Sequence, residues 1–199
     1  MKRCLIIVDV QNDFLSGGAL AVPKGNEIIS FINTIQEQYD LVVATQDWHP
    51  ANHGSFAANH QERVPGEIIE LNGLQQMLWP VHCVQNSLGA KFSEKLKMDA
   101  VQKVFVKGTD PAIDSYSGFF DNGKLQSTGL HDYLQSQGVG GVTIVGLAAD
   151  YCVKFTAMDA AELGYNVGVL REGTRAVNLQ PTDYEQSIQE MKSVGIIVK

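Results

Sequence analysis

One cysteine lies where the sequence predicts the end of a strand and the start of a helix. Cys152 follows the apolar segment 141–146 (GVTIVG) and the turn 147–150, and it precedes a segment rich in Ala, Met and Leu. A thiol at a helix N-terminus faces free backbone N–H groups and the positive end of the helix dipole, which favour the thiolate. The position therefore predicts a nucleophile, although a buried cysteine that only fills the junction fits the segment equally well.

Two charged residues stand at the ends of other predicted strands. Asp9 closes an apolar strand at the N-terminus and Lys107 closes another near the middle of the chain. Each alone has an ordinary alternative, because an Asp can end a strand by bonding to the turn and a Lys can point into water. Combined with a thiol, they provide a proton carrier and a balancing cation for amide hydrolysis. Asp13 competes for the base role, but a side-chain-to-backbone hydrogen bond would explain it.

A second group of residues has the composition of a metal site. Asp47 and His49 lie on the same side of one extended segment, and His82 lies at the far end of a long insertion. One carboxylate and two imidazoles predict a divalent metal with positions left for water or substrate, whereas the alternative is a polar surface loop. His53 is either a fourth ligand or a hydrogen-bond donor to the ligands. Cys83 is expected to point away from His82 and to be a buried, inert thiol.

These residues need a scaffold, and the periodicity of the sequence predicts an α/β fold. Near-continuous apolar strands alternate with helical patterns, which indicates a six-stranded parallel sheet with helices on both faces, a Rossmann-like three-layer arrangement. The strands are predicted at 4–8, 41–45, 103–106, 142–145, 166–170 and 195–198. Three helix faces are predicted: Ile28, Ile29, Ile32 and Ile35; Leu130, Tyr133 and Leu134; Phe155, Met158 and Leu163.

The remaining segments give weaker signals. A last helix is predicted to begin with a capping box formed by Thr182 and Glu185. The stretch 46–102 shows only weak helix patterns at 74–78 and 94–98, and long irregular insertions in compact domains are usually functional. In open parallel sheets, ligands bind beyond the carboxyl ends of the strands. Asp9, Asp47, Lys107 and Cys152 are therefore expected to share one crevice.

Length and charge limit the class of protein. The 199 residues, of which 44% are hydrophobic, suit a single domain covering 1–199. The net charge is −7 and the basic residues are scattered, so we expect no nucleic-acid or membrane partner. No apolar run is long enough to span a bilayer. The three cysteines lack paired spacing, which predicts free thiols in a reducing compartment, the cytoplasm.

Five motifs together resemble the nicotinamidases, which are amidohydrolases of the isochorismatase-like cysteine hydrolase superfamily. The motifs are DVQNDF (9–14), DWHP (47–50), WPVHCV (79–84), KG (107–108) and GLAADYCV (146–153), and the resemblance runs essentially the whole chain. It implies an isochorismatase-like fold and hydrolysis of nicotinamide to nicotinate and ammonia through a thioester, in NAD salvage. Pyrazinamide is implied as a second substrate, and homo-oligomerisation is left open.

The resemblance also implies roles for particular residues. The catalytic triad would be Asp9, Lys107 and Cys152. A divalent metal ion, zinc ahead of iron or manganese, would be held by Asp47, His49 and His82 and would bind the pyridine nitrogen.

A cis peptide is implied at Leu147–Ala148, which would turn the N–H groups of Ala148 and Cys152 into an oxyanion hole. Phe14, Trp79 and Tyr116 match positions that line the ring pocket in relatives. Ala149 departs from the family pattern, because many relatives carry threonine there.

Two other functions fit part of the pattern. A cysteine hydrolase of carbamoyl or ureido groups would use the same triad but would be expected to lack the two metal motifs. A non-haem iron oxygenase would use the two histidines and the carboxylate but has no use for Cys152, Asp9 or Lys107.

Overall fold

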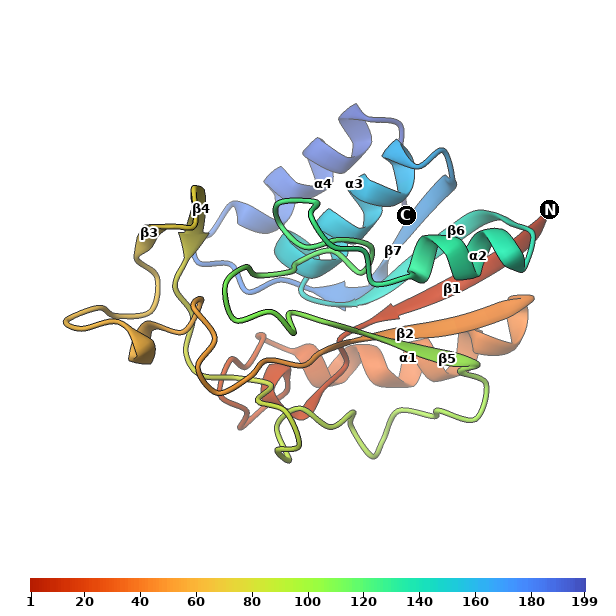
Figure 1. Cartoon of the computed structure of the whole chain (residues 1–199). Helices are drawn as coiled ribbons and strands as arrows, with labels where there is room; N and C mark the ends of the chain where they lie inside the picture. The colour runs from red at the N-terminus through yellow and green to blue at the C-terminus, as the bar shows by residue number, and fades with distance from the viewer.

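Six parallel strands form the central sheet of the computed structural model, which describes all residues 1–199 (Figure 1). The strands are β1 (Lys2–Val8), β2 (Leu41–Asp47), β5 (Lys103–Lys107), β6 (Val139–Leu147), β7 (Asn166–Arg175) and β8 (Ile197–Val198). Their order across the sheet is β5-β2-β1-β6-β7-β8, and every neighbouring pair is parallel. The predicted α/β class, the six strands and their direction are confirmed.

Helices cover both faces of this sheet. α1 (Ile28–Ile35) packs on one face, and α2 (Leu130–Ser136), α3 (Lys154–Glu162) and α4 (Asp183–Ser193) pack on the other (Figure 1). Side chains of β1 alternate between the two cores: Ile6 joins the cluster beneath α2, α3 and α4, whereas Leu5 and Ile7 join the cluster beneath α1. None of the helices combines the length and the apolar character needed to cross a membrane.

The predicted helix faces are correct for two helices and partly correct for the third. The four isoleucines of α1 are all buried, and so are Leu130 and Leu134 of α2. Of the face predicted for α3, Met158 and Leu163 are partly buried against the core, but Phe155 is 39% exposed. The helix buries the smaller Thr156, Ala157 and Ala160 more completely. Small side chains on the inward face let the α3 backbone approach the sheet, so its larger apolar residues lie at the flank.

The last helix begins where it was predicted, but without the capping box. The side chain of Thr182 makes no capping hydrogen bond to the backbone and accepts one from the Gln186 side chain. Asn178 takes over part of the capping, because its Oδ1 accepts the Tyr184 N–H at 3.0 Å. The sequence therefore predicted the start of the helix correctly, but not the residue whose side chain caps it.

The predicted helix at 74–78 is instead the second strand of a hairpin. β3 (Ile68–Leu71) and β4 (Leu74–Met77) pair antiparallel and are joined by Asn72 and Gly73, both with positive φ. An Asn-Gly pair between short strands is the preferred two-residue hairpin turn, and that signal outweighs a short run of leucine and methionine. The weak helix expected at 94–98 is also absent.

We expect the core beneath α1 to carry much of the stability. Ile32→Ala removes a fully buried side chain and should lower the free energy of unfolding by about 2–5 kcal/mol through lost burial and a residual cavity. Ile197→Ala is the control, since Ile197 is 58% exposed and its loss should change stability by less than about 1 kcal/mol. Urea denaturation followed by circular dichroism measures both; equal effects would contradict the assignment.

Candidate active site

Four neighbouring strands end side by side and carry the predicted reactive residues. Lys107 is the last residue of β5 and Asp47 the last of β2, while Asp9 directly follows β1 and Cys152 follows β6. Asp47 and Lys107 are direct partners in the parallel register of β2 and β5. The expectation that these residues share one crevice is confirmed: oxygens of Asp9 and Asp47 and Sγ of Cys152 lie within 4.8 Å of one another.

The ammonium group of Lys107 is the centre of this cluster. Its Nζ lies 2.9 Å from Asp9 Oδ2 and 3.4 Å from Cys152 Sγ, and it donates to Asp47 Oδ1. A further donation goes to the Ser115 carbonyl oxygen at 2.9 Å. The side chains of Lys107 and Asp9 are wholly inaccessible to solvent, so these charges are balanced by each other and not by water.

Burial and charge shift the pKa values of this cluster in different directions. Burial alone would lower the pKa of Lys107, but Asp47 and Asp9 outweigh it and raise that pKa well above its usual value. For Asp47, burial is outweighed by Lys107 and His49, which hold its pKa well below the usual range. The cluster therefore keeps Lys107 as a cation and Asp47 as an anion.

The thiol is not the ready thiolate that its position at a helix start suggested. Burial raises the pKa of Cys152 well above its usual value, and the nearby carboxylates add to this against the opposing charge of Lys107. Burial also raises the pKa of Asp9, with Lys107 opposing. Burial and the nearby carboxylates therefore oppose the thiolate that was expected from the helix start, and both favour the protonated thiol in the resting site.

Two residues that the sequence analysis did not assign hold the acid and a metal-site carboxylate in place. Thr45 Oγ1 donates to Asp9 Oδ1 at 2.6 Å, which leaves Asp9 Oδ2 directed at Lys107. Gln11 Oε1 accepts the Asp47 N–H, and Gln11 Nε2 donates to the Asp47 carbonyl, both at 2.8 Å. A polar residue inside an otherwise apolar strand was the available signal for Thr45; Gln11 had none beyond its motif.

The predicted metal ligands converge, and their hydrogen bonds fit a cation. His49 Nδ1 lies 2.9 Å from the Gly108 carbonyl oxygen and His82 Nδ1 lies 2.8 Å from that of Pro80. Since a carbonyl only accepts, each Nδ1 carries a proton, and Nε2 is the ring nitrogen that each histidine turns toward Asp47 Oδ2, where it is placed to ligate a metal.

The separations between these atoms fit the same conclusion. His49 Nε2 and His82 Nε2 lie 3.5 and 3.8 Å from Asp47 Oδ2. Ligand atoms held about 2.1 Å from one ion would be about 3.0–3.5 Å apart. Burial would lower the pKa of His49, but the Asp47 carboxylate raises it, so the site favours positive charge. Two imidazole nitrogens and a carboxylate, all on buried side chains, are the donor set of a divalent metal.

Glycine at position 108 is required by this arrangement. Its φ is +64°, and a Cβ there would lie 2.3 Å from Cε1 of His49. Only glycine lets the chain after β5 accept the His49 Nδ1–H while the ring stays in place. In the Lys-Gly pair, Lys107 thus provides the buried cation, and Gly108 provides the carbonyl oxygen that accepts from the candidate metal ligand His49.

His53 lies beside the metal ligands but not among them. It groups with His49 and Asp114, whereas the Asp47 site is completed by His49 and His82. Its Nδ1 accepts the Ser55 N–H at 3.1 Å, and burial lowers the pKa of His53 to about 4. His53 is therefore a neutral neighbour packed on the His49 ring, with centroids 4.4 Å apart. Of the two roles left open for it, hydrogen-bond donation to a ligand is not observed, because His53 Nε2 has no hydrogen-bond partner, and ligation stays a prediction.

The competing candidates have structural explanations. Asp13 Oδ2 accepts the Cys83 N–H at 2.7 Å and Oδ1 accepts the Ala19 N–H at 3.2 Å, as a turn residue should. Cys83 is wholly buried and burial raises its pKa, and the same is true of Cys4. The prediction that Cys83 is buried is confirmed, and its raised pKa is consistent with an unreactive thiol.

The turn before Cys152 has the predicted backbone. The Leu147–Ala148 peptide bond is cis, and a π-helical turn, Ala149–Val153, leads into α3. The Ala148 N–H has no acceptor within the protein. It is thus free to donate to a ligand beside Cys152, because both residues line the same pocket.

Aromatic side chains form much of that pocket, which we call the active-site pocket. Phe14, Trp79 and Tyr116 line it together with Asp47, His49, His82 and Cys152. Tyr116 is fixed, since its hydroxyl oxygen accepts hydrogen bonds from Gln76 Nε2 at 3.1 Å and from Trp79 Nε1 at 3.2 Å. The pocket thus brings a flat apolar wall, a thiol and a candidate metal site together, which suits a flat heteroaromatic amide.

Comparisons with known proteins agree with this geometry. The nicotinamidase of Escherichia coli K12 is 49% identical over 199 residues, covering 97% of this chain and 92% of that protein. The structure of an Acinetobacter baumannii nicotinamidase/pyrazinamidase has a TM-score of 0.96 at 41% identity and covers 99% and 95% of the two chains. The structure of a Pyrococcus horikoshii pyrazinamidase in complex with zinc has a TM-score of 0.79 at 39% identity, with 100% and 99% covered.

A model of the isochorismatase domain family matches residues 3–199. That match covers every strand and helix that contributes to the site. The protein therefore belongs to the isochorismatase family.

Proposed function

We propose that this protein is a nicotinamidase, which hydrolyses nicotinamide to nicotinate and ammonia in NAD salvage and also accepts pyrazinamide. Nearly full-length similarity to nicotinamidases supports the assignment. The observation that carries it is the meeting, in one pocket, of a thiol held against a buried Lys–Asp pair and a three-ligand metal site. Three free cysteines support the cytoplasm as its compartment.

Cys152, Asp9 and Lys107 would perform the chemistry by moving one proton. As Sγ of Cys152 bonds to the amide carbon, the thiol proton passes to Asp9, and the Lys107 ammonium stabilises the charges that develop. The N–H groups of Ala148 and Cys152 would donate to the carbonyl oxygen as it becomes an anion. Asp9 then returns the proton to the departing nitrogen, the C–N bond breaks, and ammonia leaves a nicotinoyl thioester.

In the second half of the reaction, water is the attacking group and the sulfur of Cys152 is the leaving group. A water molecule gives one proton to Asp9 as its oxygen attacks the thioester carbon, and the oxyanion is held as before. Collapse breaks the C–S bond, Asp9 returns its proton to sulfur, and nicotinic acid leaves and loses its remaining proton to solvent to give nicotinate. The raised pKa values of both Asp9 and Cys152 suit a proton that passes between them.

Asp47, His49 and His82 would hold one divalent cation. Zinc is favoured because the Pyrococcus horikoshii relative binds it, and the ligand set also accepts iron or manganese. Bound there, the cation would coordinate the pyridine nitrogen and hold the ring. Phe14, Trp79 and Tyr116 would pack on that ring.

The rival functions explain less of the site. A non-haem iron oxygenase has no use for the Cys152–Lys107–Asp9 cluster. A hydrolase of ureido groups has no use for a metal site facing an aromatic pocket. Ammonia release from nicotinamide, compared with acetamide and urea derivatives, tests the choice directly.

Replacement of the nucleophile gives the sharpest test of the mechanism. Cys152→Ser should lower kcat on nicotinamide by about 10³-fold or more, because a hydroxyl is a far weaker acid than a thiol. Cys83→Ser is the matched control, since that thiol is buried outside the proposed chemistry. Near-normal turnover by the Cys152→Ser enzyme would show that the sulfur is only structural.

The hydrogen bond from Thr45 should matter to catalysis through the orientation of Asp9. Thr45→Val keeps the shape but loses the donor, so kcat should fall about 10- to 100-fold with little change in KM. Thr45→Ser keeps the hydroxyl and should restore most of the rate. Steady-state kinetics on all three enzymes checks this; equal loss in both variants would indicate a packing role instead.

Metal removal should act on substrate binding more than on the chemistry of the thiol. His82→Ala, or dialysis against a chelator, should raise KM for nicotinamide by about 10- to 100-fold because the ring loses its anchor. Iodoacetamide should still alkylate Cys152 in the treated protein, as mass spectrometry of the peptide would report. A KM that does not change on chelation, with metal loss shown by elemental analysis, would contradict the anchoring role.

A further inference from the structure

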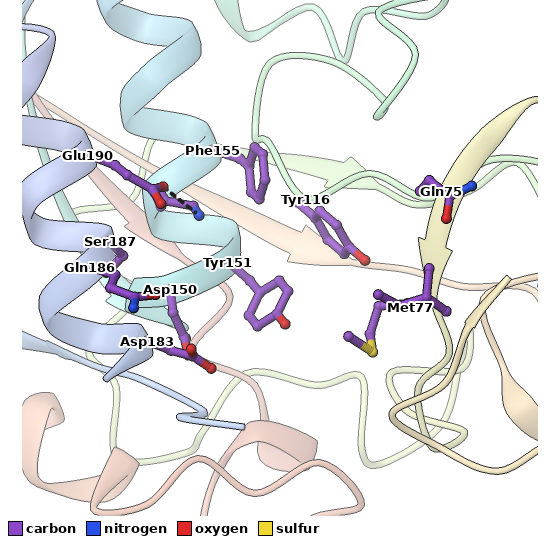
Figure 2. A pocket seen from close by; sticks show the side chains of 12 residues that line it. Gln75, Met77, Tyr116, Asp150, Tyr151, Phe155, Asp183, Gln186, Ser187 and Glu190 are labelled. Carbon is purple, nitrogen blue, oxygen red and sulfur yellow. Dashed lines mark hydrogen bonds and ion pairs between the residues drawn. The ribbon is translucent and has the colours of Figure 1, made fainter. Parts of the chain in front are cut away.

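A second cavity adjoins the active-site pocket on the outer side of the aromatic wall. This outer pocket has a volume of about 290 Å³ and lies between the β3–β4 hairpin and helices α3 and α4 (Figure 2). Gln75 and Met77 approach it from the hairpin, while Gln186 and Glu190 approach it from α4. Cavities of about 300 Å³ and upward are the size that holds small ligands in proteins.

The two cavities share a wall made of tyrosines. Tyr116 and Tyr151 line both of them, so their side chains separate the inner space from the outer one. Tyr116 is fixed through Gln76 and Trp79, whereas the Tyr151 hydroxyl has no hydrogen-bond partner and the residue is only half-buried. Tyr151 is therefore the part of the wall that can turn aside without breaking a hydrogen bond.

The inner cavity is small by comparison. Its volume is about 30 Å³, which is space for about two water molecules. A substituent on the ring of a bound amide would therefore have little further space within it. The adjoining volume beyond Tyr151 is where such a substituent can go.

The lining of the outer pocket carries a net negative charge. Asp150, Asp183 and Glu190 contribute three carboxylates, against one ammonium from Lys154. Lys154 Nζ pairs with Glu190 Oε2 at 2.9 Å, so two carboxylates are left without a cationic partner in the pocket. The electrostatic field in the outer pocket therefore disfavours an anionic group on the ligand and favours a neutral or positive one.

We propose that the outer pocket is a substituent subsite: it receives groups attached to the ring of a heteroaromatic carboxamide whose amide lies at Cys152, and it selects neutral or cationic groups over anionic ones. The inference rests on the proposed function, because it takes the amide at Cys152 as the reacting end. It extends the substrate class from unsubstituted pyridine and pyrazine amides to ring-substituted ones.

Three probes of similar size and different charge test the proposal. They are nicotinamides that carry an aminomethyl, a hydroxymethyl or a carboxylate group on the same ring carbon, prepared in turn for ring carbons 4, 5 and 6. Ammonia release gives kcat/KM relative to nicotinamide. For at least one ring position, the aminomethyl and hydroxymethyl compounds should exceed the carboxylate by about tenfold.

Three variants test whether the charge preference arises in the outer pocket. Gln186→Lys adds a cation to the lining and should reduce the preference for aminomethyl over carboxylate by about fivefold. Gln189→Lys adds the same charge to an exposed position of α4 that does not line the pocket, and should leave the preference near that of the unmodified enzyme. Tyr151→Ala should raise kcat/KM for the hydroxymethyl compound relative to nicotinamide.

The outcomes that overturn the proposal are separate from those that overturn the function. Normal nicotinamide hydrolysis with no charge preference at any ring position would exclude the subsite and leave the nicotinamidase assignment standing. Equal effects of Gln186→Lys and Gln189→Lys, or an unchanged ratio in Tyr151→Ala, would do the same. Absence of nicotinamide hydrolysis would overturn the proposed function and the subsite with it.

Discussion

The buried ammonium of Lys107, held between two carboxylates, is the interaction on which the site depends. An unpaired charge with no access to water would cost several kcal/mol, so the three charged groups must meet with little freedom. Asp47 and Lys107 are partners in the β2–β5 register, and Thr45 pairs with Val8, next to Asp9. A slip of one residue between these strands would move a charge into the hydrophobic core, which means that the register of the sheet and the geometry of the site stabilise each other.

Asp47 joins the two halves of the site through its two oxygens. Oδ1 accepts from Lys107, and Oδ2 faces the Nε2 atoms of His49 and His82. Gln11 holds the backbone of Asp47 through two hydrogen bonds. Because one carboxylate contacts both Lys107 and the candidate metal ligands, the proposed nucleophile and the proposed ring anchor would be kept at a fixed separation, which is what a flat substrate with two attachment points requires.

The sequence predicted those parts of the structure that follow from local pattern and from the geometry of parallel sheets. Apolar runs located the six strands, and residues at or just after the carboxyl ends of β1, β2, β5 and β6 had to converge. The hairpin at Asn72-Gly73 was missed although its local signal was present, and the inward face of α3 was misjudged because small residues carry little hydrophobic weight. The Thr45–Asp9 bond and the outer pocket join segments far apart in the chain, and no local pattern encodes them.

The pKa of Cys152 depends on burial as well as on its position at the start of a helix. A helix start lowers a thiol pKa, whereas burial raises the pKa of Cys152, so burial favours a thiol beside an acid whose own pKa is also raised. The site then holds one mobile proton shared by two groups and one fixed cation. In the proposed mechanism such a thiol passes its proton to Asp9 when a carbonyl carbon is held against the sulfur. The same burial that favours the protonated thiol strengthens the contacts of Lys107 with the carboxylates, so in the proposed mechanism the balancing cation is already in place when the sulfur attacks.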